Sequence, residues 1–196
     1  MAKKSITPTT LLTPLPAVLV TCGDSSLSDN SISKPNIITI AWCGIVCSKP
    51  PMLSISVREN RYSFNLIKQS GEFVVNMAGA NLANEVDYCG NYSGKDYDKF
   101  KENNLTPEPA QYVKAPLIKE SPINLECKVR QTHNLGSHYM FIGEIIATHI
   151  DEDILNSDGS LDVAKLDPLI YATKARQYWS GLSKTHGYYG FTKEQK

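Results

Sequence analysis

The feature that most constrains the fold of this chain is a series of strand-like segments without the regular strand–helix alternation of parallel sheets. The two longest, Ile123 to Thr132 and Tyr139 to Ile150, flank Asn134-Leu135-Gly136-Ser137, which has the composition of a hairpin turn. Earlier strands are expected at Pro16 to Cys22, Asn36 to Val46, Met52 to Val57 and Glu72 to Met77. This order favours an antiparallel β-barrel over a doubly wound sheet. The predicted fold class is mainly β with short helices.

The longest predicted helix follows the third of these strands. Asn60 is placed to cap a helix that runs through Ser70, and Gly71 is placed to end it. Short helices are expected at Leu82 to Tyr88 and near Asp96. A β-bulge is expected at Gly143, and a polar loop is expected from Gly23 to Pro35.

Size and charge narrow the classes of function. The 196 residues predict a single domain, and 20 basic residues balance 20 acidic ones. A neutral chain has no electrostatic attraction for nucleic acid or anionic lipid, so we expect a small-molecule partner, no nucleic acid and no membrane. The longest nearly apolar run, Ile37 to Cys47, is shorter than the roughly 20 residues that cross a bilayer. Ser5 to Thr10 is polar where a signal peptide needs an apolar segment, which predicts a cytoplasmic location.

The cysteines and histidines argue against a disulfide framework and a metal site. The five cysteines are an odd number and contain no C-x-x-C pair. The four histidines do not stand at metal-ligand spacings with the cysteines or with paired carboxylates. We therefore expect free thiols and no bound metal.

One segment predicts an anion site. Ser56-Val57-Arg58-Glu59-Asn60-Arg61-Tyr62-Ser63 places two guanidinium groups and a hydroxyl around a predicted helix N-terminus. First-turn amides carry partial positive charge, and arginine can bind a phosphate through two parallel hydrogen bonds. The alternative, an exposed helix with solvated arginines, fits this segment alone equally well.

A second loop could contribute to the same anion site. Cys89-Gly90-Asn91-Tyr92-Ser93-Gly94-Lys95-Asp96 has glycines that let backbone amides approach a ligand, with Lys95 beside them. Such loops are also ordinary turns with a solvated lysine. The chain has neither a G-x-G-x-x-G motif between strand and helix nor a Walker-type lysine loop, which argues against the common dinucleotide and triphosphate sites.

Six segments together resemble the flavin reductase-like, FMN-binding split-barrel family, and more narrowly its flavoredoxin-like branch. They are 35–42 (PNIITIAW), 49–52 (KPPM), 56–63 (SVRENRYS), 71–76 (GEFVVN), 93–100 (SGKDYDKF) and 137–144 (SHYMFIGE). Their order and spacing from about Leu15 to Ile150 carry the resemblance. Beyond Ile150 the similarity weakens, so residues 151–196 are interpreted as a C-terminal extension of the one domain, 1–196.

The resemblance implies an antiparallel, Greek-key-like split barrel that forms a homodimer and binds FMN near the subunit interface. Thr39, Ala41, Trp42 and Cys43 would line the isoalloxazine ring. The ribityl chain and phosphate would be held by Ser56, Val57, Arg58, Arg61 and Ser63, with help from Ser93, Gly94 and Lys95. His138 stands where the family commonly has a histidine facing the flavin, which makes it the candidate catalytic residue.

Two of these residues also have purely structural interpretations. A lone histidine at the start of a strand is often solvent-facing, and a tryptophan within a strand is usually part of a core. The aromatic C-terminal segment, which includes Trp179, Tyr188, Tyr189 and Phe191, could cover the flavin or form a dimer contact.

Three functions follow as hypotheses. The first is an oxidoreductase that takes electrons, by hydride transfer from NAD(P)H, onto bound flavin and passes them to flavin or a small acceptor. The second is a flavoredoxin-like electron carrier that a protein partner reduces. The third is a barrel that binds another phosphate ligand or haem. The electron donor, the final acceptor and the pathway are not determined by the sequence.

Overall fold

The structure is a computed structural model that describes residues 2–24, 34–182, 184–189 and 192. Most of the predicted polar loop, and Phe191 of the aromatic C-terminal segment, lie outside the described residues. No helix among the described residues is long and apolar enough to cross a lipid bilayer.

Strands dominate the structure, as the sequence predicts. The strands are β1 Leu15–Pro16, β2 Val18–Cys22, β3 Asn36–Ile40, β4 Cys43–Ser48, β5 Pro51–Val57, β6 Glu72–Met77, β7 Pro107–Glu108, β8 Leu117–Ile118, β9 Ile123–Asn134, β10 Tyr139–Ile150, β11 Ile170–Ala172 and β12 Gln177–Trp179. The α-helices are α1 Tyr62–Ser70, α2 Ala83–Asn91, α3 Lys99–Glu102 and α4 Val163–Leu166, with 3₁₀ turns η1 Ala80–Leu82 and η2 Glu152–Ile154.

One curled sheet of seven strands forms the half-barrel, in the order β3-β2-β6-β9-β10-β5-β4. Every neighbouring pair in it is antiparallel. The predicted bulge is confirmed, since the β9–β10 register shifts between Ile142 and Gly143. A Cβ at Gly143 would stand only 2.7 Å from Cζ of Phe73, so the bulge coincides with a close approach across the core. The predicted antiparallel, mainly β fold class is confirmed.

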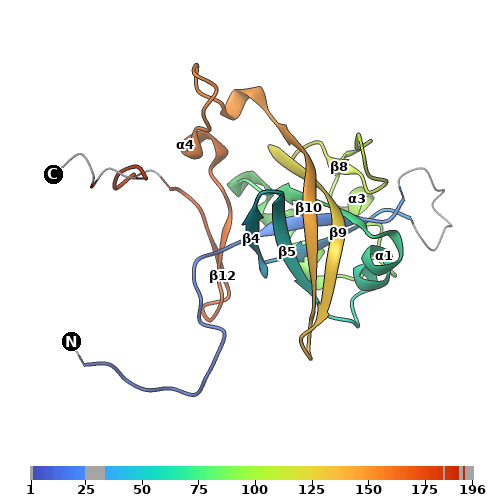
Figure 1. Ribbon diagram of the computed structural model, residues 1–196, viewed down its shortest axis with the longest axis horizontal. Helices are drawn as coiled ribbons and strands as arrows, with labels where there is room; N and C mark the ends of the chain where they lie inside the picture. Colours follow the sequence, from blue (N-terminus) through green and yellow to red (C-terminus); the bar gives the residue numbers. More distant parts are fainter. Residues whose placement is uncertain (1, 25–33, 183, 190–191, 193–196) are drawn as a thin grey trace.

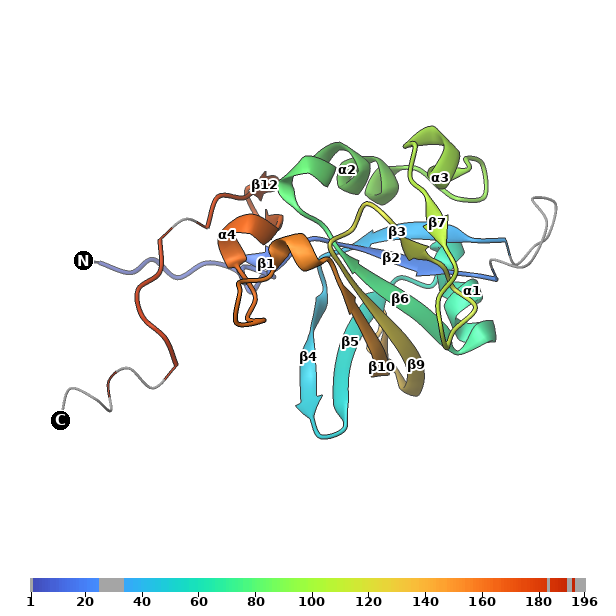
Figure 2. The same ribbon diagram turned by 90° about the horizontal axis from the view of Figure 1, so that it is seen from above.

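The strand predicted from Asn36 to Val46 is wrong as a single element. The chain turns at Ala41 and Trp42, so that β3 pairs with β2 at one edge of the sheet while β4 pairs with β5 at the other. The β4–β5 hairpin projects from the body of the sheet (Figure 2). An apolar run cannot reveal such a change of partner, because both halves have the same strand chemistry.

Helix α1 begins one residue later than Asn60 would place it as a cap. Arg61 is the N-cap residue, with an extended backbone and no side-chain capping hydrogen bond. The amide of Arg61 donates to the carbonyl of Arg58, and this turn delays the helix. The predicted end is confirmed, because Gly71 adopts the left-handed conformation with φ of 67°.

Two apolar clusters lie on the two faces of β2 and β3. Side chains inside the curl, among them Val20, Ile55 and Phe141, pack against α1. On the other face, Leu19 and Ile37 pack against α2 and against Leu169 just before β11. Figure 2 shows α2 and α3 covering this second face of the sheet. Burial of both faces explains why β2 and β3 are apolar without alternation.

The segment after β10 crosses back to the second face. Its short strands β11 and β12 form a three-stranded sheet with β1, and Asp167 Oδ1 accepts a hydrogen bond of 2.7 Å from the amide of Gly181. In Figure 1 this segment and the N-terminal segment both lie beside the barrel, on the side away from α1. Tyr171 and Tyr178 pack against the α2 cluster, so residues from the extension reach the mouth of the barrel.

A buried carboxylate anchors the proline-rich loop between β7 and β8. Glu126 is fully buried and accepts hydrogen bonds from the amides of Gln111, Tyr112 and Val113 at 2.7–3.1 Å. His149 Nε2 lies 2.7 Å from the same carboxylate. Burial alone would raise the pKa of Glu126, but these hydrogen bonds outweigh it and hold the pKa below its ordinary value.

Candidate functional site

A cleft of about 610 Å³ lies at the mouth of the half-barrel. We call it the main cleft. Its lining comes from the turn between β3 and β4, the end of β5, the start of α1, the end of α2, the start of β10 and the β11–β12 hairpin. Cavities of roughly 300–1,000 Å³ bind cofactors and other small molecules.

The main cleft brings together most of the site residues that the sequence predicts. These are Thr39, Ala41, Trp42, Ser56, Val57, Arg58, Arg61 and His138. They come from four elements separated by up to about one hundred residues in the chain. These elements are brought together in space by the curl of the sheet. Their convergence supports the interpretation of these segments as one site.

Trp42 and His138 face the main cleft as nearly parallel rings. Their planes differ by 7° and their centroids lie 6.2 Å apart. Trp42 is 40% exposed, so the alternative of a core tryptophan is wrong. Partial burial, together with the charge of Arg58, lowers the pKa of His138. The lowered pKa favours the neutral imidazole, whose Nδ1 lies 2.9 Å from the hydroxyl oxygen of Ser137, so Nε2 is the nitrogen available to a ligand.

A smaller pocket of about 100 Å³ adjoins the main cleft and shares Ile38, Arg61 and Gly90 with it. We call it the small pocket. Ser63, Ser93 and Gly94 of the predicted site line it. The buried Asn36 donates a hydrogen bond of 2.7 Å from Nδ2 to the hydroxyl of Ser63.

Gly94 closes the small pocket because it has no side chain. A Cβ at this position would overlap Oδ1 of Asn36. The close approach at Gly94 is therefore to a side chain of the pocket wall, and the approach of this loop's backbone to a ligand stays a prediction.

Lys99 also lines the small pocket, and the sequence interpretation did not assign it a role. Its side chain is buried, and Nζ donates hydrogen bonds of 2.7 Å to the carbonyls of Ile37 and Cys89. Burial lowers the pKa of Lys99 to about 8, with a smaller contribution from the charge of Arg61. An ammonium has three donors, so one remains beyond the two carbonyls.

The two predicted arginines are free to bind a ligand. Among the described residues, neither the Arg58 nor the Arg61 side chain makes a hydrogen bond or an ion pair. No side chain caps the first-turn amides of α1. The main cleft and the small pocket are thus lined by the guanidiniums of Arg58 and Arg61, by the buried ammonium of Lys99 and by the uncapped amides of α1. These cavities contain little negative charge to compensate the positive groups.

Two predicted residues line neither cavity. The side chain of Cys43, the first residue of β4, packs against the interior of the curl and not into the cleft. Burial raises the pKa of the Cys43 thiol to about 11. Lys95 is exposed, and only its amide is engaged, donating to the hydroxyl of Ser93 at 3.2 Å.

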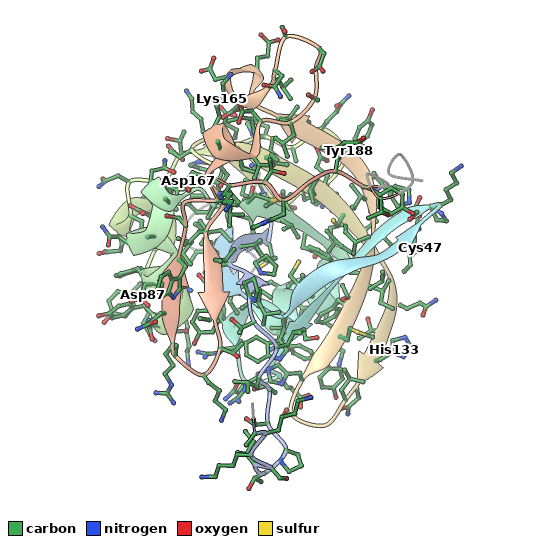
Figure 3. All side chains as sticks on the ribbon, turned by 90° about the vertical axis from the view of Figure 1, so that its left-hand side faces the viewer. Cys47, Asp87, His133, Lys165, Asp167 and Tyr188 are labelled. Carbon is green, nitrogen blue, oxygen red and sulfur yellow. The ribbon has the colours of Figure 1, made fainter. Side chains whose placement is uncertain are left out.

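Other cleft residues have no local motif that could have revealed them. Asp87 lies on α2, and it accepts a hydrogen bond of 3.3 Å from the hydroxyl of Tyr178, 91 residues later. Figure 3 shows Asp87 beside the β11–β12 hairpin. Tyr171 and Arg176 of that hairpin complete the main cleft.

These features fit a cofactor that joins a planar ring system to a phosphate. Aromatic rings line the main cleft, and cations line the small pocket, where the ammonium of Lys99 retains one hydrogen-bond donor for a ligand. In the described part of the chain, no group of three or more His, Cys, Asp or Glu side chains could hold a metal ion.

A curled antiparallel half-barrel with a cleft at its mouth defines a split-barrel protein. The chain belongs to the family described as "flavin reductase like domain", whose sequence profile matches residues 11–180. The cofactor class of this family is a flavin.

Solved structures place the chain in the flavoredoxin branch. Flavoredoxin of Desulfovibrio vulgaris (Miyazaki F) is 35% identical, with a TM-score of 0.87, and covers 96% of this chain and 98% of that one. Flavoredoxin from Methanosarcina acetivorans is 30% identical, with a TM-score of 0.86, and both chains are covered completely. An uncharacterized protein of Archaeoglobus fulgidus is 34% identical over 152 residues, which are 78% of this chain and 80% of that protein.

Proposed function

We propose that this protein is an FMN-dependent oxidoreductase that accepts electrons from NAD(P)H on bound flavin and passes them to flavin or a small acceptor. The observation that carries this proposal is the buried Lys99 in a pocket beside Arg61 and Ser63, directly adjoining a cleft lined by Trp42 and His138. A buried ammonium is costly unless an anion compensates it. The small pocket therefore suits the phosphate of the cofactor.

The size of the small pocket favours FMN. About 100 Å³ has room for one phosphate group but not for a further nucleotide. The main cleft would take the isoalloxazine ring against Thr39, Ala41 and Trp42, with Ser56 and Val57 beside the ribityl chain. Arg58, Arg61, Ser63, Ser93 and Gly94 would hold the phosphate end together with Lys99.

When bound, a flavin supplies hydride and single-electron transfer, and the protein contributes position and electrostatics. His138 is the proposed catalytic residue, because its neutral imidazole lies in the main cleft, where a hydrogen bond to the ring or the substrate is within reach. Trp42 excludes water from one side of the cleft and orients planar ligands by stacking.

Spectroscopy and a double variant test the cofactor. The purified protein, incubated with FMN, should show flavin absorption bands, and Arg58→Gln with Arg61→Gln should bind FMN at least about 100-fold more weakly, since two charge-assisted hydrogen bonds are lost. Lys68→Gln is the control, because Lys68 is an exposed cation on the same helix outside both cavities. Full flavin occupancy in the folded double variant would refute the proposed phosphate site.

The second candidate function is an electron carrier that a protein partner reduces, and the two flavoredoxin neighbours favour it. Steady-state oxidation of NADH and NADPH with free FMN as acceptor separates the two. Rapid turnover supports the oxidoreductase. A yellow protein that dithionite reduces but NAD(P)H does not would support the carrier.

We also propose a homodimer, with the face of the β4 edge strand as its interface. Ile45 and Val46 are 69% and 49% exposed on this strand, and exposed apolar residues on an unpaired sheet edge favour association. Light scattering of the wild type and of Ile45→Asp tests this, and the variant should be monomeric.

We place the protein in the cytoplasm. All five cysteines are free thiols, which suits a reducing compartment. The division into one domain with an extension from residue 151 also remains a prediction, and truncation after Ile150 would test it.

A further inference from the structure

Arg176 is a cation of the main cleft that the proposed cofactor site does not use. It lies on the β11–β12 hairpin and lines the main cleft but not the small pocket. Among the described residues it makes no hydrogen bond or ion pair through its side chain. An exposed, unpaired guanidinium at the wall of a ligand cleft is available to an anion.

The charges of the two cavities exceed what one cofactor phosphate balances. Arg58, Arg61 and Arg176 line the main cleft, and Asp87 is its one carboxylate among the described residues. Asp87 already accepts the hydroxyl of Tyr178. A phosphate monoester carries about −1.5 to −2 charges near pH 7, which is less than the combined positive charge of Arg58, Arg61 and Lys99 at the proposed cofactor phosphate site. Positive charge therefore remains in the main cleft for a second anionic ligand.

The backbone at Arg176 is unusual for this residue type. Arg176 ends the turn of residues 173–176 between β11 and β12, with φ of 53°, in the left-handed region. Glycine or asparagine adopts this conformation at lower cost than arginine. The position thus carries a long cationic side chain in spite of its backbone, and such outliers concentrate at ligand sites.

We propose that Arg176 forms an oxyanion subsite for the second ligand of the cleft, and that this subsite binds a phosphate of the dinucleotide electron donor. The planar guanidinium matches a phosphate through two parallel hydrogen bonds. The subsite is separate from the proposed cofactor phosphate site at Arg58, Arg61, Ser63 and Lys99. The identity of the ligand rests on the proposed function, because the donor is NAD(P)H there.

Arg176→Gly is the decisive variant because glycine suits the left-handed backbone and removes only the side chain. Lys174→Gln is the matched control, since Lys174 is an exposed cation on the same turn that lines no cavity. Both variants change the net charge equally. The wild type and the variants, loaded with FMN, are compared for KM with NADH and NADPH and for binding of ADP and 2′,5′-ADP by calorimetry.

Arg176→Gly should raise the KM for the donor and the Kd for ADP by about tenfold or more, with FMN affinity unchanged within about twofold. Its melting temperature should equal or exceed that of the wild type. Lys174→Gln should leave every value unchanged. An effect on NADPH and 2′,5′-ADP alone would assign the subsite to the 2′-phosphate, and an equal effect on NADH and ADP would assign it to the pyrophosphate.

Unchanged affinity for both ADP and 2′,5′-ADP in Arg176→Gly would overturn the proposal, as would a loss of FMN in place of these ligands, which would assign Arg176 to the cofactor. The ADP titration uses the FMN-loaded protein and needs no turnover. A wild type that does not oxidise NAD(P)H would refute the proposed function, while the ADP affinities of the FMN-loaded protein would still decide the subsite.

Discussion

The pH dependence of FMN binding is the sharpest consequence of the buried Lys99. Its pKa is about 8 in the free protein, against an ordinary value of 10.5. A phosphate in the small pocket would stabilise the charged ammonium and return the pKa toward the ordinary value. Above pH 8 the free protein therefore loses this proton while the complex retains it, so binding takes up a proton and weakens as the pH rises.

The magnitude follows from the difference between the two pKa values. If the complex restores the ordinary pKa fully, the Kd for FMN rises about tenfold per pH unit above pH 8 and about 30-fold between pH 7 and pH 9.5. The neighbouring thiols do not interfere, because burial raises the pKa of Cys89 to about 11 and that of Cys22 to about 12. Both stay protonated over this range.

Fluorescence titration of FMN at a series of pH values measures the effect, with circular dichroism at each pH to show that the protein is folded. Lys99→Met is the informative variant, since it has a similar length and no charge. It should bind FMN more weakly at pH 7, by about 10- to 100-fold, and its Kd should not change between pH 7 and pH 9.5. A wild-type Kd that is constant over that range would refute the assignment of Lys99 to the phosphate.

Three further predictions concern the small pocket, the cleft histidine and the buried carboxylate. Gly94→Ala should weaken FMN binding about tenfold in a titration, because the new Cβ displaces Asn36; unchanged affinity would place the phosphate elsewhere. Since the pKa of His138 is lowered, the rate of flavin reduction in stopped-flow experiments should not change from about pH 8 to pH 6.5, and a transition at or above pH 7 would contradict a neutral imidazole. Glu126→Gln should lower the free energy of unfolding in urea by about 2–4 kcal/mol, because buried donors, including that of His149, lose a charged acceptor. The depressed pKa of Glu126 stabilises the fold above pH 4.5 and this stabilisation is lost as the pH falls further, so the variant should lose less stability in acid than the wild type.

Local chemistry made several elements predictable from the sequence. Gly71 ends α1 because a left-handed residue favours glycine, and the hairpin between β9 and β10 follows from its turn residues. The break between β3 and β4 was not predictable, because both strands have the same apolar composition. Only their different pairing partners, β2 and β5, separate them.

The candidate site likewise has residues that could be predicted from the sequence and residues that could not. Arg58, Arg61 and Ser63 lie close together in the chain, and the anion chemistry of that segment is visible in its residue types. The sequence favoured Lys95 as the helper because it stands beside Gly94. The structure brings Lys99 into the small pocket instead, where its ammonium donates hydrogen bonds to the carbonyls of Ile37 and Cys89, which are distant in the chain or on another helix.

What the amino-acid sequence alone determined is therefore the strands β2, β5, β6, β9 and β10, the end of α1 at Gly71 and the cationic character of residues 56–63, because each depends on neighbours within about ten residues. The tertiary structure decided which distant groups meet. Asp87, Lys99, His138 and Arg176 reach two adjoining cavities from four separate elements only because the sheet curls and the extension folds back over its mouth. No periodicity or spacing encodes that convergence, since it depends on the packing of the whole chain.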